Sequence, residues 1–161
     1  MTGVVYGLHV NPQGGVPKFP VDVLEIHATG CVGDKQNDTR HHGGPERAVC
    51  LMERRIMTAL QEAGHPIQPG TTGENLLIDG LDPGSLAVGV VLQIGEVQLT
   101  ITSDAPPCKT IRASFEDGAF KNLSHRATPG QTRWYARVNR GGAIQLGDSV
   151  EVNSSEPIGN Q

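Results

Sequence analysis

The chain has 161 residues, a length typical of a single domain and sufficient to bury a hydrophobic core. Its formal net charge is −4, and it has no basic run with interleaved aromatic residues, which argues against a nucleic-acid polymer as partner. No stretch reaches the roughly 20 apolar residues of a membrane helix, and the N-terminus lacks the pattern of a signal peptide.

The first half of the chain predicts short strands separated by one long loop. Glycine (21 residues) and proline (11 residues) are frequent, which favours strands joined by turns over long helices. Residues 4–10 predict a strand, and residues 22–28 alternate apolar and polar side chains, as a half-buried strand does. Residues 29–47 show no periodicity and many turn formers, and the apolar run 48–52 predicts the next strand.

One helix is predicted, over residues 53–64. Ile56, Met57 and Leu60 fall on one face of this helix, and that spacing is typical of a helix packed against a core. Gly64 is placed to end the helix as a C-terminal cap.

The second half of the chain predicts further strands. Residues 71–81 combine a turn with a short strand, and residues 86–102 form a hairpin pattern around Gly-Glu. Residues 111–123 carry a weaker helical pattern. Residues 132–152 predict two strands around Arg-Gly-Gly, followed by a turn at Leu-Gly-Asp.

We therefore expect a mostly β protein with a few helices, built as a small barrel-like domain. No internal repeat or linker divides it, so we assign residues 1–153 to one domain. Residues 154–161 are polar and predict a loose C-terminal tail.

The irregular loop gathers positive charge around two consecutive glycines, Gly43 and Gly44. Consecutive glycines let backbone N–H groups converge on an anion, and arginine suits phosphate or carboxylate. The charged or ionisable residues around them are Lys35, Arg40, His41, His42 and Arg47. The alternatives are a solvated turn, or zinc held by the two histidines with Cys31 or Cys50. Adjacent histidines on an extended chain point in opposite directions, which disfavours zinc.

Two shorter segments could line a site. Gly73 permits a close backbone approach, and Glu74 and Asn75 can orient a polar ligand or stabilise the loop. In the segment after residue 132, strand alternation places Tyr135 and Arg137 on one side and the single tryptophan on the other.

Cys108 is the strongest reactive candidate of three cysteines, none of which has CxxC spacing. Free thiols in this number favour a reducing cytoplasm. Two prolines immediately before Cys108 stiffen the chain, and nearby Lys109 and Arg112 favour the thiolate. A thiolate is a nucleophile and also a soft metal ligand. Cys50 lies in an apolar run and is expected in the core.

The order of these blocks resembles the MOSC domain, the C-terminal module of molybdenum-cofactor sulfurases, which also occurs alone. The matching segments are GDKQNDTRHHGGPERAVCLM, TTGENLLIDGL, SDAPPCK and RWYARVNRGGAIQLGDSVEV. They extend from the Gly33-Asp34 turn to Val152, and the length suits a stand-alone member. The resemblance implies a strongly bent β-barrel.

The resemblance also implies a pocket for the molybdenum cofactor (molybdopterin), with Cys108 as molybdenum ligand and catalytic residue. Some relatives reduce N-hydroxylated compounds by two electrons. The cofactor's phosphate and enedithiolate suit the basic loop. The residues expected on the cofactor side are Lys35, His41, His42, Gly43, Gly44, Arg47, Gly73, Glu74 and Asn75, with Arg112 and Arg137 added on chemistry and position.

Family membership leaves the activity open. The first hypothesis is an oxidoreductase that reduces a small N-hydroxylated substrate and receives electrons from a separate redox partner. The second is a sulfur carrier that holds a persulfide on Cys108, supplied by a cysteine desulfurase. The third is a non-catalytic module that binds the cofactor or a protein partner.

Overall fold

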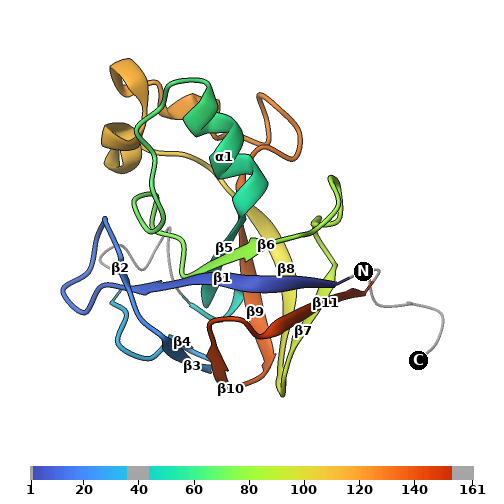
Figure 1. The fold of residues 1–161 in the computed structure, drawn as a ribbon. Helices are drawn as coiled ribbons and strands as arrows, with labels where there is room; N and C mark the ends of the chain where they lie inside the picture. The colour runs from blue at the N-terminus through green and yellow to red at the C-terminus, as the bar shows by residue number, and fades with distance from the viewer. Residues whose placement is uncertain (1, 36–43, 154–161) are drawn as a thin grey trace.

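Seven strands close into a barrel in the computed structural model, which describes residues 2–35 and 44–153 (Figure 1). The barrel order is β11, β7, β8, β9, β5, β6 and β1, and β1 also pairs with β11. The β5–β6 pair is parallel, and the other strand pairs within the described residues are antiparallel. The expectation of a mostly β, barrel-like fold is confirmed. The strands are β1 (Thr2–Val10), β5 (Val49–Glu53), β6 (Leu76–Asp79), β7 (Val91–Ile94), β8 (Val97–Ala105), β9 (Arg133–Arg140) and β11 (Ser149–Asn153).

A second, three-stranded sheet lies against the barrel. Its order is β10 (Gly142–Gln145), β3 (Val23–His27) and β4 (Gly30–Cys31). The short strand β2 (Phe19–Pro20) pairs with β1. The chain leaves the barrel for this sheet at Gly141, where a Cβ atom would lie 2.5 Å from a backbone oxygen of β3, so glycine is needed there.

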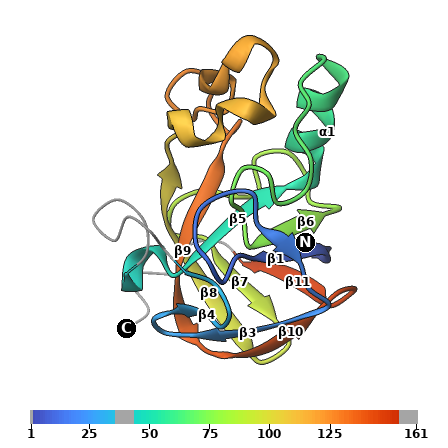
Figure 2. The ribbon, with the colours of Figure 1, turned by 90° about the vertical axis from the view of Figure 1, so that its left-hand side faces the viewer.

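One end of the barrel is covered by the helix α1 (Arg54–Glu62) and by three short 3₁₀ segments (Figures 1 and 2). These segments are η2 (Lys109–Ser114), η3 (Glu116–Gly118) and η4 (Phe120–Asn122). The buried face of α1 is the predicted one, Ile56, Met57 and Leu60, and it packs with Ile111 and Phe115. Within the described residues, no helix is long and apolar enough to span a membrane.

Residues 111–123, where the sequence has a weak helical pattern, lie in separate 3₁₀ turns and not in one helix. Asp117 takes a positive φ of 55° and Gly118 one of 68°, so the helical hydrogen-bond ladder is interrupted. The prediction of a helix here was therefore wrong in type, although the backbone does turn locally. Short 3₁₀ turns let the chain fold back tightly over α1.

The barrel wall separates two groups of side chains. Leu51 of β5 lies opposite Trp134 of β9, and both belong to the barrel core. The neighbouring pair, Cys50 and Tyr135, points to the other face and packs with Ala105. Cys50 is buried, as expected, but it lies outside the main core because side chains alternate along a strand.

A buried ion pair fixes the start of the loop that follows β4. The ammonium of Lys18 lies 2.7 Å from each carboxylate oxygen of Asp34, and the two side chains are only 6% and 3% exposed. The Asn75 amide also donates to Asp34, at 2.9 Å, and to the carbonyl of His9, at 3.1 Å. This network joins β1, the β4 loop and the segment before β6.

His9 of β1 is a second buried polar group, only 3% exposed. It is closely packed: a Cβ atom on Gly7 would lie 2.9 Å from its ring. Burial lowers the pKa of His9, and the nearby Glu74 opposes that shift only in part. The folded protein therefore favours the neutral imidazole.

Removing one member of the buried ion pair should destabilise the fold strongly. Lys18→Met leaves the Asp34 carboxylate buried without its cation, so we expect the free energy of unfolding to fall by about 3–5 kcal/mol. Urea unfolding followed by circular dichroism measures this loss. Lys121→Met, at an exposed position, is the control. A loss below about 1 kcal/mol for Lys18→Met, as expected for a surface pair, would contradict the assignment.

His9 should make the protein less stable in mild acid. The unfolded chain binds a proton on this histidine near pH 6.5, whereas the folded chain does so only at lower pH. Stability is therefore full above about pH 6.5 and declines as the pH falls below it. Urea unfolding at pH 7.5 and 5.5 should show a smaller acid loss for His9→Gln than for wild type. His27→Gln, at an exposed position, should keep the wild-type acid loss; equal losses in all three proteins would refute the role of His9.

Candidate functional site

Cys108 lies between the end of β8 and the start of η2. Pro106 and Pro107 precede it, and its own backbone is extended, with φ −139° and ψ 169°. Its carbonyl accepts a hydrogen bond from the Ile111 N–H at 3.1 Å. The sulfur is half-buried and lies 2.7 Å from the hydroxyl oxygen of Thr110. The thiol is therefore held in place but remains partly accessible.

Tyr135 is the residue around which the candidate site is arranged. It is 5% exposed and pairs with Cys50 across β5 and with Ser103 across β8. Burial is the main cause that raises the pKa of Tyr135, and the nearby thiols of Cys50 and Cys108 add to it. The guanidinium groups of Arg133 and Arg47 act in the opposite direction but do not cancel the shift. The phenol therefore stays protonated and able to donate.

The described end of the basic loop reaches the same tyrosine. Its 3₁₀ segment η1 (Pro45–Arg47) places the Arg47 guanidinium 5.5 Å from the centre of the Tyr135 ring, a cation–π geometry. The hydroxyl of Thr102 donates to the carbonyl of Glu46 and also to that of Tyr135, at 3.2 Å. Arg47 thus lies over the ring of Tyr135, and Cys108, far away in sequence, acts on the same phenol electrostatically.

Arg133 is a buried cation on the same face of β9. It is 4% exposed and donates to three backbone carbonyls, those of Thr72, Ala105 and Pro106. Its Nε has no hydrogen-bond partner among the described residues. Burying a hydrogen-bond donor without a partner lowers the stability of the fold by about 1–3 kcal/mol. An acceptor atom of a ligand that bonded to this nitrogen would remove that penalty.

The segment Gly73–Asn75 is fully buried, and its side chains are engaged within the protein. The Glu74 carboxylate accepts from the Gly70 N–H and from the Thr72 hydroxyl, both at 2.6 Å. Asn75 accepts from the Cys50 N–H at 3.0 Å, besides its bonds to Asp34 and His9. These groups hold the backbone around Cys50 and the turn before β6, and direct contact with a cofactor stays a prediction.

The structure places the remaining described candidates on separate elements. Arg137 is half-buried on β9, two positions after Tyr135 and therefore on the same face. Arg112 is exposed on η2, Lys35 is exposed beyond Asp34, and Gly44, with a φ of 81°, immediately precedes η1. His41, His42 and Gly43, together with Arg40, lie outside the described residues.

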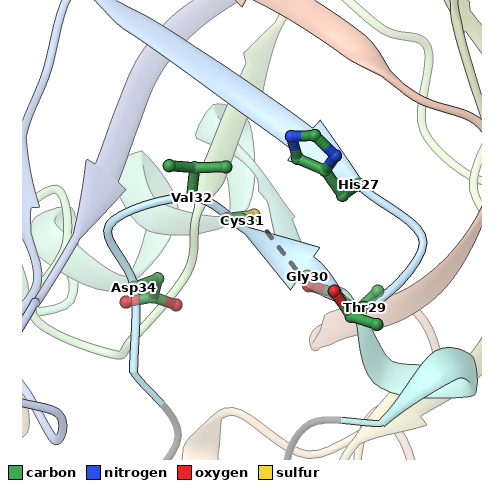
Figure 3. Close-up of a pocket in the computed structure, with 7 residues that line it drawn as sticks. His27, Thr29, Gly30, Cys31, Val32 and Asp34 are labelled. Atoms are coloured by element: carbon green, nitrogen blue, oxygen red, sulfur yellow. Dashed lines mark hydrogen bonds between the residues drawn. The ribbon is translucent and has the colours of Figure 1, made fainter.

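The other two cysteines are not arranged like Cys108. Cys31 borders a cavity of about 210 Å³ next to β3 and β4, which Figure 3 shows with its seven lining residues. Burial raises the pKa of Cys31, and it raises that of Cys50 to about 11. Both thiols are therefore protonated at neutral pH.

Among residues 2–35 and 44–153, no three His, Cys, Asp or Glu side chains are grouped to hold a metal ion.

Sequence reasoning missed Lys18, Asp34 and Arg133. The signal for Arg133 was present, because alternation along β9 places it on the same side as Tyr135 and Arg137. No local pattern marked Lys18 and Asp34, whose pairing depends on two turns that meet only in the folded chain.

Comparison with known proteins places this chain among related sequences of similar fold. The family model described as the MOSC domain matches residues 38–151. The chain is 27% identical over 144 residues to the uncharacterized protein YflK of Bacillus subtilis, a match covering 88% of this chain. It spans 64% of YflK, less than two thirds of that protein's length. It is 25% identical over 158 residues to the protein YiiM of Escherichia coli, covering 95% of this chain and 70% of YiiM.

Solved structures show the same architecture. The crystal structure of the YUAD protein from Bacillus subtilis superposes with a TM-score of 0.76 at 21% identity, covering 94% of this chain and 96% of that one. The structure of YiiM from Escherichia coli gives a TM-score of 0.70 at 24% identity, covering 96% and 70%. With the family model matching most of its length, this chain belongs to the MOSC domain family.

Proposed function

We propose that this protein binds the molybdenum cofactor and reduces N-hydroxylated compounds by two electrons, with Cys108 as the molybdenum ligand. The observation that carries the proposal is that two groups act on Tyr135: the Arg47 guanidinium lies 5.5 Å from the centre of its ring, and the Cys108 thiol adds to the rise in its pKa. A soft sulfur donor and a cation therefore act on the same buried phenol. An anionic, sulfur-bearing metal cofactor needs that combination of groups.

The donor set of this face fits such a group. Arg47 and Arg133 act electrostatically on Tyr135, and Arg137 follows on the same side of β9. The Nε of Arg133, unpaired among the described residues, offers a buried donor for an anionic oxygen or sulfur. His41, His42 and Gly43 are further cofactor-side candidates, as are Gly44, Lys35 and Arg112.

Each residue of the site has a definite role in this proposal. Cys108 holds the metal, and Arg47 and Arg137 bind the anionic groups of the cofactor. Tyr135 keeps its proton because burial raises its pKa, so it serves as a hydrogen-bond donor. Glu74 and Asn75 fix the backbone beside the site, and Gly73, with a φ of 84°, allows the turn before them.

When bound, the molybdenum centre supplies two-electron redox chemistry. Reduction of an N–OH group consumes two electrons and two protons and releases water, so a donor of electrons is required. We propose a separate redox partner for that role, in the cytoplasm. The three free thiols support a reducing compartment.

The partial accessibility of Cys108 also supports a second candidate function. A sulfur carrier needs a thiol that a cysteine desulfurase can reach, and Cys108 is half-buried while Cys31 and Cys50 are buried. In this function Cys108 carries a persulfide to an acceptor in metal–sulfur assembly, and the basic face receives the acceptor.

Replacing Cys108 should remove the metal. Purified from a host that makes the cofactor, wild-type protein should contain about one molybdenum and one pterin per chain. Cys108→Ser should lose at least about tenfold in molybdenum content, because oxygen replaces the soft sulfur ligand. Elemental analysis and pterin fluorescence measure both contents, with Cys31→Ala as the control.

Metal-free wild-type protein from such a host would contradict the proposed reductase. One added sulfur atom on Cys108 after incubation with a cysteine desulfurase and cysteine, detected by intact mass, would then establish the sulfur carrier. Slow alkylation of Cys108, with cofactor binding unchanged in Cys108→Ala, would indicate a non-catalytic binding module instead.

Loss of an arginine on this face should weaken cofactor retention. A charge-assisted hydrogen bond contributes about 1.5–3 kcal/mol, so Arg47→Gln or Arg137→Gln should release pterin at least about tenfold more readily. Pterin remaining after dialysis at rising salt is the measurement. The exposed Arg126→Gln variant should retain wild-type levels, and equal retention in all variants would exclude the two arginines from the site.

A further inference from the structure

Arg133 lies where two segments of the candidate site come together. It begins β9 and pairs in register with Ala105, the last residue of β8. One guanidinium nitrogen, Nη1, donates to the Thr72 carbonyl at 2.8 Å. The other, Nη2, donates to the carbonyls of Ala105 at 3.2 Å and Pro106 at 3.0 Å. A single side chain therefore links the turn before Glu74 to the segment that carries Cys108.

The segment before Cys108 needs such a link because of its prolines. Pro106 and Pro107 have no backbone N–H, so this stretch cannot fasten itself to the barrel by donating from either residue. It can only accept hydrogen bonds, and Arg133 supplies them to the Ala105 and Pro106 carbonyls. Cys108 follows two residues later, and its carbonyl then accepts from Ile111. The thiol is thus held from both sides.

The same arginine is connected to a buried negative charge. Thr72, whose carbonyl accepts from Arg133, donates its hydroxyl to the Glu74 carboxylate at 2.6 Å. Arg133 makes no direct ion pair with any carboxylate in the described part of the chain. A buried cation held in this way is costly, and a hydrophobic residue of similar volume would often stabilise a protein as well. Stability alone therefore does not account for it.

We infer that Arg133 is a positioning residue for Cys108: its bonds to Thr72, Ala105 and Pro106 set where the thiol stands relative to Tyr135 and Arg47. The inference rests on the proposed function only in taking Cys108 as the working thiol. It adds a residue that neither the motif around Cys108 nor the basic loop contains. It also makes the placement of Cys108 depend on the turn that holds Glu74.

The test compares Arg133→Gln, Arg133→Lys and Arg140→Gln by hydrogen–deuterium exchange. Arg140 lies on the same strand but is exposed, so it controls for loss of charge. Arg133→Gln should speed exchange in the segment 108–115 by at least about tenfold, the equivalent of the lost hydrogen bonds, while β1 and β11 keep wild-type rates. Arg133→Lys, which keeps the charge and part of the donor capacity, should give an intermediate rate, and Arg140→Gln should match wild type.

Exchange within twofold of wild type in folded Arg133→Gln would overturn the inference, as would a uniform rise along the whole barrel. If Arg133→Gln does not fold, Arg133→Lys is judged by the same criterion, and failure of both to fold would assign Arg133 to the fold and not to Cys108. Protein from a host without cofactor synthesis is used throughout. If wild-type protein from a cofactor-producing host contained no molybdenum, the proposed function would be wrong. The exchange rates measured for the Arg133 variants would not be affected by that outcome.

Discussion

The pairing of β9 with β8 on one side and β5 on the other is the interaction on which the site depends. It sends Trp134 into the barrel core and Tyr135 to the opposite face, beside Cys50 and Ala105. A shift of one residue in this register would exchange the two faces and bury the arginines in an apolar core. The core packing of Trp134 therefore also fixes which side chains of β9 share the opposite face with Tyr135.

Two buried polar networks fasten loops to the barrel strands on this side of the molecule. Lys18, Asp34 and Asn75 hold the start of the basic loop, while Arg133 links the turn at Thr72 to the chain before Cys108. Both networks satisfy backbone carbonyls or carboxylates that would otherwise be buried without partners, and each joins segments distant in sequence. The half-buried Cys108 therefore follows a segment that is fastened to the barrel wall.

Much of the local structure could be predicted from the sequence, because it follows from side-chain periodicity. The hairpin of β7 and β8, the buried face of α1 and the turns around β10 occur where the alternation and the glycines place them. The segment 111–123 formed 3₁₀ turns because Asp117 and Gly118 adopt positive φ, which a weak helical pattern does not reveal. Glu74 and Asn75 turned out to be bonded within the protein, since the polarity of a residue does not tell which partner satisfies it.

The sequence by itself determined that the chain is a barrel of the MOSC family and that Cys108 stands behind two rigid prolines. These properties depend on residue order and local geometry. Only the tertiary structure decided that Arg47 lies over the ring of Tyr135, and that Arg133 holds the segment before the thiol. Those contacts join residues dozens of positions apart, and their existence depends on strand register and barrel closure, which no local pattern encodes.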